Sequence, residues 1–200
     1  LKANILPKSF FTVENEEMLE TSLLGKKISN PIGLAAGFDK SAEVYNSLFK
    51  FGFGFIEVGT VTPKQQLGNP KPRIFRLEKD EALINRLGFN NHGSETVSKR
   101  ISNNLPDGFL GINIGPNKET KNKEDDYYIC LSRLGMYAGY VTINNSTPNT
   151  EGLRDFHDQE AMKKLLFGIN KIIKEKKIEC PVAIKISPDI KDDEIGKIVD

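Results

Sequence analysis

Residues 109–144 read FLGINIGPNKETKNKEDDYYICLSRLGMYAGYVTIN, and this stretch decides the fold class. Its two apolar runs, 109–114 and 140–144, have the length and composition of buried strands. Between them, a polar loop over 116–123 leads into a helix that begins near Glu124. A strand, a helix and a second strand in this order predict two parallel strands joined by a crossover helix.

The same alternation extends in both directions along the chain. Apolar runs predict three further strands, at 32–36, 55–61 and 182–186. Helical spacing of apolar residues begins near residue 41 and recurs over 158–177. The lysines on the polar side of that last helix are expected to face solvent: Lys171, Lys174, Lys176 and Lys177.

Five strands with crossover helices predict an α/β fold with a parallel sheet. A closed (β/α)8 TIM barrel typically needs ~250 residues, so the chain is expected to cover about its first five β/α units. A doubly wound open sheet remains an alternative on pattern alone. No GxGxxG motif follows the first strand, however, so a dinucleotide-binding fold has little support.

Two segments do not fit the alternation, within what we expect to be the amino-terminal part of one barrel domain over 1–200. Residues 62–93 form a long polar insertion after the second strand, and such loops usually carry function or a small structure of their own. Residues 1–29 are expected to form an entry segment and a hairpin at one end of the barrel. The chain begins at Leu1 and stops at Asp200 inside a helical pattern, so an excerpt of a longer protein is expected.

Composition excludes several classes of function. Lysine and arginine number 28 against 27 acidic residues, so there is no basic excess with which to bind nucleic acid. Two cysteines without CxxC spacing argue against a disulfide framework, and two distant histidines argue against a metal site. No apolar run approaches the roughly 18 to 20 residues that span a bilayer.

Polar and small residues gather where the predicted strands end. The segment 36–40 follows the first strand, Gly59 and Thr60 the second, Asn113 the third and 144–150 the fourth, while Lys185 lies in the fifth. Ligands of β/α barrels bind at these carboxyl ends. Asparagine suits the imide groups of a planar ring, and lysine suits an anion. Lys185 lies between two isoleucines, and in a buried strand it would need an anionic partner.

Several strings in the chain closely resemble the class 2, quinone-dependent dihydroorotate dehydrogenases. They are NPIGLAAGFDK at 30–40, GFIEVGTVTPKQQLGNPKPRIFRL at 54–77, INRLGFNNHG at 84–93, GINIGPNK at 111–118, STPNTEGLR at 146–154 and VAIKISPD at 182–189. Class 1 enzymes use a cysteine base after the fourth strand, and here that loop has no cysteine. The resemblance implies an FMN barrel that oxidises dihydroorotate to orotate in pyrimidine (UMP) biosynthesis.

The resemblance also implies roles for individual residues. Those that would contact FMN are Ala36, Gly37, Phe38, Asp39, Lys40, Thr60, Asn113, Asn144 and Lys185. Those that would bind the substrate are Lys40, Asn85, Arg86, Leu87, Gly88, Phe89, Asn144 and Asn149. Lys185 would stabilise the negative charge that grows on the flavin as it accepts hydride.

The loop that carries the family's serine base departs from the family pattern. The residue before Pro148 is Thr147, which we expect to be the base, with Ser146 as the alternative. Asn145 stands where the family has an apolar residue. Threonine keeps the hydroxyl but adds a methyl group and a stiffer χ1, so we expect the substitution to affect the rate of the reaction more than its identity.

The resemblance further implies partners and a location. Electrons would pass from FMN to a membrane quinone at a separate site, and peripheral membrane contact would be made by an amino-terminal segment missing from this chain. The protein would then lie on the cytoplasmic side of the bacterial inner membrane or on the mitochondrial inner membrane. Two alternatives are another FMN barrel enzyme and a non-catalytic fragment.

Overall fold

The computed structural model describes residues 17–145, 159–187, 190 and 195–196. Its strands are β1 (Thr21–Leu23), β2 (Lys26–Ile28), β3 (Gly33–Leu34), β4 (Phe55–Val61), β5 (Ile74–Leu77), β6 (Ala82–Asn85), β7 (Phe109–Ile114), β8 (Tyr140–Asn144) and β9 (Val182–Lys185). Its α-helices are α1 (Tyr45–Phe49), α2 (Ser94–Asn103), α3 (Lys123–Leu134) and α4 (Gln159–Lys176). Single 3-10 turns are η2 (Glu17–Leu19), η3 (Glu78–Asp80) and η4 (Gly135–Tyr137).

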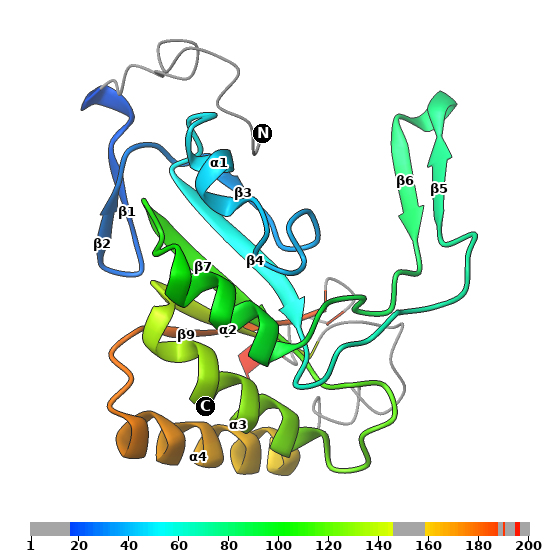
Figure 1. Ribbon diagram of the computed structural model, residues 1–200, viewed down its shortest axis with the longest axis vertical. Helices are drawn as coiled ribbons and strands as arrows, with labels where there is room; N and C mark the ends of the chain where they lie inside the picture. The colour runs from blue at the N-terminus through cyan, green and yellow to red at the C-terminus, as the bar shows by residue number, and fades with distance from the viewer. Residues whose placement is uncertain (1–16, 146–158, 188–189, 191–194, 197–200) are drawn as a thin grey trace.

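Five of these strands form one parallel sheet in the order β3-β4-β7-β8-β9. Each new strand is added on the same side of the previous one, so the order never reverses (Figure 1). A doubly wound sheet would place its first strand inside the sheet and reverse direction from there. The observed order is that of an unclosed β/α barrel and excludes the doubly wound alternative.

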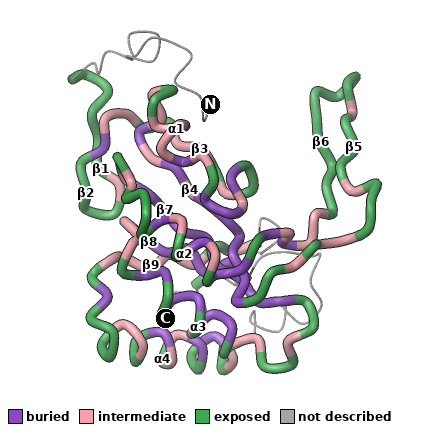
Figure 2. Tube along the Cα trace, in the orientation of Figure 1, coloured by how far each residue is buried: buried purple, intermediate pink, exposed green. Residues whose placement is uncertain are grey.

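The helices α2, α3 and α4 cover one face of this sheet (Figure 1). Side chains alternate along each strand, and those of the alternate residues that pack against the helices are fully buried. Figure 2 shows much of β4 as buried. This core contains Ile56, Val58, Leu110, Ile112, Val141 and Ile143 from the strands and Val97, Ile101, Tyr127, Leu131 and Leu165 from the helices. The lysines predicted to face solvent, three in α4 and Lys177 directly after it, are exposed. In the described part of the chain, no helix has the length and apolar character needed to cross a bilayer.

The first β/α unit differs from its prediction. The expected buried strand over 32–36 is wrong in length and burial: β3 has two half-buried residues, and Ile32 is 65% exposed. The reason is position, because β3 is the edge strand and pairs with β4 alone. The helix expected from residue 41 begins only at Tyr45, after Ala42 adopts a positive φ of +52°.

The predicted hairpin and insertion both have structure of their own. The strands β1 and β2 pair antiparallel around Leu24 and Gly25. The insertion contains a second hairpin, β5–β6, which projects from the sheet and is largely exposed (Figures 1 and 2). A bridge between Gln66 and Asn91 closes the base of the insertion. The hairpin therefore stands at the carboxyl ends of the strands, where barrel ligands bind.

Candidate active site

Three polar side chains from neighbouring strands meet at the carboxyl ends of β4, β7 and β8. Thr60 donates a hydrogen bond from Oγ1 to Oδ1 of Asn113 at 2.6 Å. Nδ2 of Asn144 donates to Thr60 Oγ1 at 3.1 Å and to Asn113 Oδ1 at 3.2 Å. All three residues are buried. The sequence predicted each of them as a cofactor contact, and the fold brings them into one cluster, which we call the amide cluster.

Two glycines hold the loop after β3 against this cluster. Gly37 donates its N–H to the carbonyl of Gly59 at 2.9 Å, and Gly59 donates to the carbonyl of Asp39 at 3.0 Å. Both glycines have φ of +112°, which other residues rarely adopt. A Cβ on Gly59 would lie 2.3 Å from the Asn113 carbonyl oxygen, whereas one on Gly37 would meet open space. The loop therefore leaves an unobstructed backbone surface beside the amide cluster.

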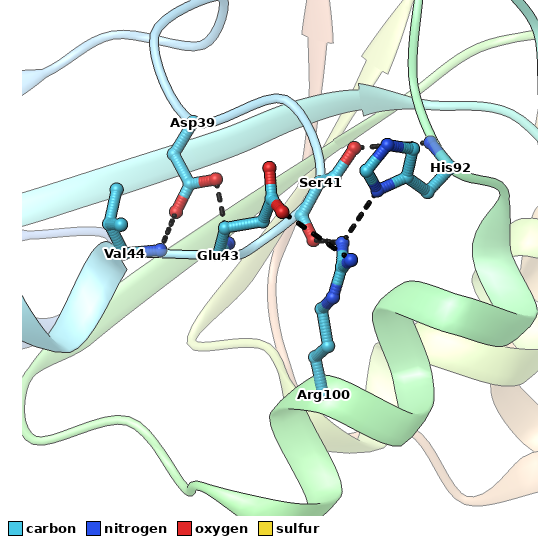
Figure 3. Close-up of polar contacts among 6 residues, drawn as sticks. All are labelled: Asp39, Ser41, Glu43, Val44, His92 and Arg100. Carbon is cyan, nitrogen blue, oxygen red and sulfur yellow. Dashed lines mark hydrogen bonds and ion pairs between the residues drawn. The ribbon is translucent and has the colours of Figure 1, made fainter. Parts of the chain in front are cut away.

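Asp39 shapes the loop that carries Lys40. Its buried carboxylate accepts the backbone N–H of Glu43 and of Val44, both at 2.8 Å (Figure 3). These two bonds orient the chain just before α1 and stabilise the turn, as a capping carboxylate does. Asp39 thus has a clear structural role, and its predicted contact with a cofactor stays a prediction.

Arg100 of α2 fixes the same loop from the other side (Figure 3). Its Nη1 donates to the carbonyl of Ser41 at 2.8 Å and lies 2.9 Å from Nδ1 of His92, while Nη2 lies 3.4 Å from a carboxylate oxygen of Glu43. His92 in turn donates its backbone N–H to Ser41 Oγ at 3.1 Å. Lys40 is therefore held between two anchored neighbours.

Lys40 itself lies half-buried in a hollow of about 410 Å³. Burial and the positive charge of Arg73 lower the pKa of Lys40 below its usual value. Asn90, which also lines the hollow, has a buried Oδ1 without a hydrogen-bond partner in the described structure. Two cationic groups and an amide at one hollow suit an anionic ligand.

The base of the insertion is tied to the sheet by two asparagines. Asn91 accepts the N–H of Thr62 at 3.2 Å and donates to Thr62 Oγ1 at 2.8 Å. Asn117 donates from Nδ2 to Thr62 Oγ1 at 3.1 Å and to Gln66 Oε1 at 3.1 Å. Phe89 is buried and accepts a hydrogen bond from Asn91 Nδ2 on its carbonyl at 2.8 Å. Its ring and Thr60 both lie against Gly115, where a Cβ would meet them.

Comparison with known sequences identifies the family. A family model described as dihydroorotate dehydrogenase matches residues 18–200. The chain belongs to the dihydroorotate dehydrogenase family. The dihydroorotate dehydrogenase (quinone) of Bartonella tribocorum is 47% identical over 189 residues, which cover 92% of this chain and 52% of that protein. The protein of the same name from Yersinia pestis is 45% identical over 204 residues, which cover 97% and 60%.

Solved structures of dihydroorotate dehydrogenases share the fold. The Eimeria tenella enzyme in complex with ferulenol matches with a TM-score of 0.85 at 40% identity, covering 92% of this chain and 56% of that one. The ligand-free form of the same enzyme gives 0.84 at 40% identity, covering 93% and 59%. The predicted TIM barrel and the predicted resemblance to the quinone-dependent class are confirmed. The chain spans between half and three fifths of its relatives' length.

Other residues predicted for the dihydroorotate dehydrogenase site lie apart from the amide cluster. Asn85 and Arg86 are exposed at the base of the β5–β6 hairpin, where Arg86 donates to the carbonyl of Pro72. Phe38 is 69% exposed. Lys185 pairs in register with Asn144 but is exposed, so the buried environment expected for it is wrong in this chain. Lys185 is exposed because β9 is the last strand of the described sheet and has a neighbour on one side only.

Some predicted residues lie outside the described structure, and some contributors to the site were missed. Thr147, Ser146 and Asn149 belong to the first group. The contributors that the sequence did not reveal are Glu57, Asn91, Arg100, Asn117 and Asp126, whose carboxylate accepts the N–H of Asn117 at 2.8 Å. A charge inside the apolar run 55–61 was the one available signal, and it points to Glu57.

We predict that replacing Arg100 loosens the Lys40 loop. Arg100→Met removes the bonds to Ser41 and Glu43, so amide hydrogen exchange over residues 39–44 should accelerate about 10-fold, the effect of losing one or two hydrogen bonds. Hydrogen-exchange mass spectrometry would measure this. Lys99→Met is the matched control, because the Lys99 ammonium pairs with Glu95 on the exposed side of α2, away from the loop. Unchanged exchange over 39–44 in the Arg100 variant would contradict the assignment.

Proposed function

We propose that the protein oxidises (S)-dihydroorotate to orotate, with FMN as hydride acceptor and a membrane quinone as final electron acceptor, in pyrimidine (UMP) biosynthesis. The observation that carries the proposal is the amide cluster of Thr60, Asn113 and Asn144 beside the half-buried Lys40. Curated relatives at 45–47% identity bear the name dihydroorotate dehydrogenase (quinone). The proposal extends their activity to this chain.

The described residues fit FMN. The backbone at Gly37 faces open space, so a flat ring can approach it closely. The amide cluster supplies donors and acceptors within one small buried region, as the imide edge of an isoalloxazine ring requires. When bound, FMN would supply the two-electron chemistry, and the chain would supply binding, orientation and charge. Lys185, beside Asn144 in register, would place a cation near this region.

The substrate would lie between the Lys40 loop and the insertion. Lys40 can pair with a carboxylate, and its lowered pKa reflects burial beside a second cation, Arg73, a setting that an anion would relieve. We infer that Asn85 and the segment 86–89 approach the ligand from the hairpin side, with Asn144 and Asn149 from the strand side. Arg100 and His92 join the Lys40 loop to the end of the insertion.

Thr147 is proposed as the base that removes a proton from a ring carbon of the substrate. Pro148 restricts the preceding residue to extended backbone geometry, which narrows the directions its hydroxyl can take. A hydroxyl is a poor base and needs a relay for its proton, and Thr150 and Phe89 are proposed to shape that relay. Ser146 is the alternative.

An apolar electron acceptor is supported by a second hollow at the same end of the barrel. Its volume is about 750 Å³, and its lining combines the apolar side chains of Phe38, Pro72, Ile74 and Leu87 with the polar ones of Lys40, Lys71, Arg73 and Asn90. Phe38 and Ile74 are largely exposed, at 69% and 46%. Lys40 lines this hollow as well as the first one, so an apolar quinone here would lie close to the proposed substrate. Membrane association, bacterial or mitochondrial, follows from a lipid-soluble acceptor.

The first test of this function is the choice of electron acceptor. The full-length enzyme loaded with FMN should form orotate from dihydroorotate with a soluble quinone analogue and should ignore fumarate and NAD. Equal or better turnover with fumarate would overturn the quinone assignment. Absence of turnover with every acceptor, in FMN-loaded protein, would support the alternative of an inactive form.

A second test concerns the base. Thr147→Ala should slow reduction of bound FMN by dihydroorotate at least ~100-fold, the low end of what a positioned general base contributes. Thr147→Ser should keep or improve the rate, because it removes a methyl group and retains the hydroxyl. Stopped-flow absorbance isolates this step from quinone chemistry. Ser146→Ala is the control, and a slow Ser146 variant beside a normal Thr147→Ala would move the base by one residue.

A third test uses the pKa of Lys40. An anionic ligand binds more tightly while Lys40 is protonated, so affinity for orotate should fall as pH rises through the lowered pKa, below the usual 10.5. Binding should be accompanied by proton uptake in that range, because the ligand raises the pKa again. Isothermal titration calorimetry would measure both quantities. Lys40→Arg should flatten the pH dependence of orotate affinity, since arginine stays charged. If the variant keeps the pH dependence of the wild type, Lys40 is not the group that causes it.

A further inference from the structure

Glu57 lies beneath the amide cluster on the face of the sheet opposite the helices. Its neighbours Ile56 and Val58 point into the helix-packed core, so strand alternation turns Glu57 toward the barrel interior. Oε1 accepts a hydrogen bond from Nδ2 of Asn113 at 2.8 Å. Oε2 accepts one from Tyr140 Oη at 2.8 Å and one from Thr142 Oγ1 at 3.0 Å.

The surroundings of this carboxylate are built to hold it. Gly111 leaves room for the ring of Tyr140, because a Cβ there would lie 2.2 Å from the ring carbon Cζ. The ring thus crosses to Glu57 and presents its hydroxyl. Burial and the charge of Glu57 raise the pKa of Tyr140, so the hydroxyl keeps its proton and remains a donor. A carboxylate that accepts three hydrogen bonds is well satisfied for a charge inside a barrel.

A carboxylate can only accept hydrogen bonds, and this decides how Asn113 is oriented. The Asn113 amide must turn its NH2 group toward Glu57, which places Oδ1 toward Thr60 and Asn144. The Thr60 hydroxyl then donates to Asn113 and accepts from Asn144. Reversing the amide would set NH2 against the NH2 of Asn144. One partly buried charge therefore determines the donor and acceptor pattern of the whole amide cluster.

We propose that Glu57 is a positioning residue that fixes the orientation of the Asn113 amide and thereby the pattern that Thr60 and Asn144 present to the flavin. The inference rests on the proposed function, because it takes the amide cluster as the FMN site. Glu57 acts through Asn113 and requires no contact of its own with the cofactor.

The test moves the carboxylate from position 57 to position 113 and the amide from position 113 to position 57. In Asn113→Asp, two carboxylates face each other, so FMN affinity should fall at least about 10-fold at neutral or alkaline pH. It should recover toward acidic pH, because one carboxyl takes up the proton that lets it donate. In the double variant Glu57→Gln/Asn113→Asp, the glutamine amide donates to the carboxylate introduced on β7 and accepts from Tyr140 and Thr142. That variant should regain affinity to within about threefold and lose the acid recovery.

The measurements are FMN affinity of the full-length protein by flavin fluorescence titration, and thermal unfolding of each variant. Tyr140→Phe is the control, because it removes one bond to Glu57 and leaves Asn113 in place; its affinity should change by no more than about threefold. A double variant that unfolds at a temperature close to that of Asn113→Asp or above it, and yet binds FMN no more tightly, overturns the proposal. Wild-type protein that binds no FMN would instead overturn the proposed function, so the two failures are distinguishable.

Discussion

The pairing of β4, β7 and β8 is the constraint on which the site depends. β7 and β8 pair in register, and β4 pairs in register with β7 from Phe55 to Val58 but shifts by one residue before Val61, within the segment that holds Thr60. Parallel strands in register place Asn113 beside Thr142, and Asn144 beside Lys185. Because side chains alternate along each strand, apolar residues face the helices and polar ones face the interior in the same layers. A slip of one residue would send Asn113 into the helix-packed core and Ile112 toward the ligand. The buried isoleucines and valines of the core therefore hold the amide cluster in place.

The sequence predicted the interior of the fold better than its edges. The strands at 55–61, 109–114 and 140–144 have the predicted bounds, because each is an apolar run packed between two neighbours. The expected strand at 32–36 and the expected burial of Lys185 were wrong, since β3 and β9 are edge strands of the described sheet. Periodicity reports which residues can be buried, and a neighbour is still needed to bury them.

For the site, the sequence identified residues at strand ends and missed those that orient them. Thr60, Asn113 and Asn144 follow from strand position, because the carboxyl ends of parallel strands lie together. Arg100, His92 and Asn117 act across long separations in sequence, and their contacts depend on how α2 and the insertion dock. No spacing rule encodes such contacts. Glu57 is the exception, since a charge within an apolar strand marks a group that needs partners.

The described part of the site is thus oriented from two directions. From below, Glu57 dictates the hydrogen-bond pattern of the amide cluster. From the side, Arg100 joins the loop that carries Lys40 to His92, which follows closely on the predicted substrate residues 85–89. Both supports are charged groups whose partners are mostly polar groups of fixed geometry, and such bonds are short and directional. The buried Oδ1 of Asn145, without a hydrogen-bond partner in the described structure, contrasts with them. Asn145 directly precedes the loop with Thr147, so this unsatisfied oxygen adjoins the segment in which the chain departs from its family.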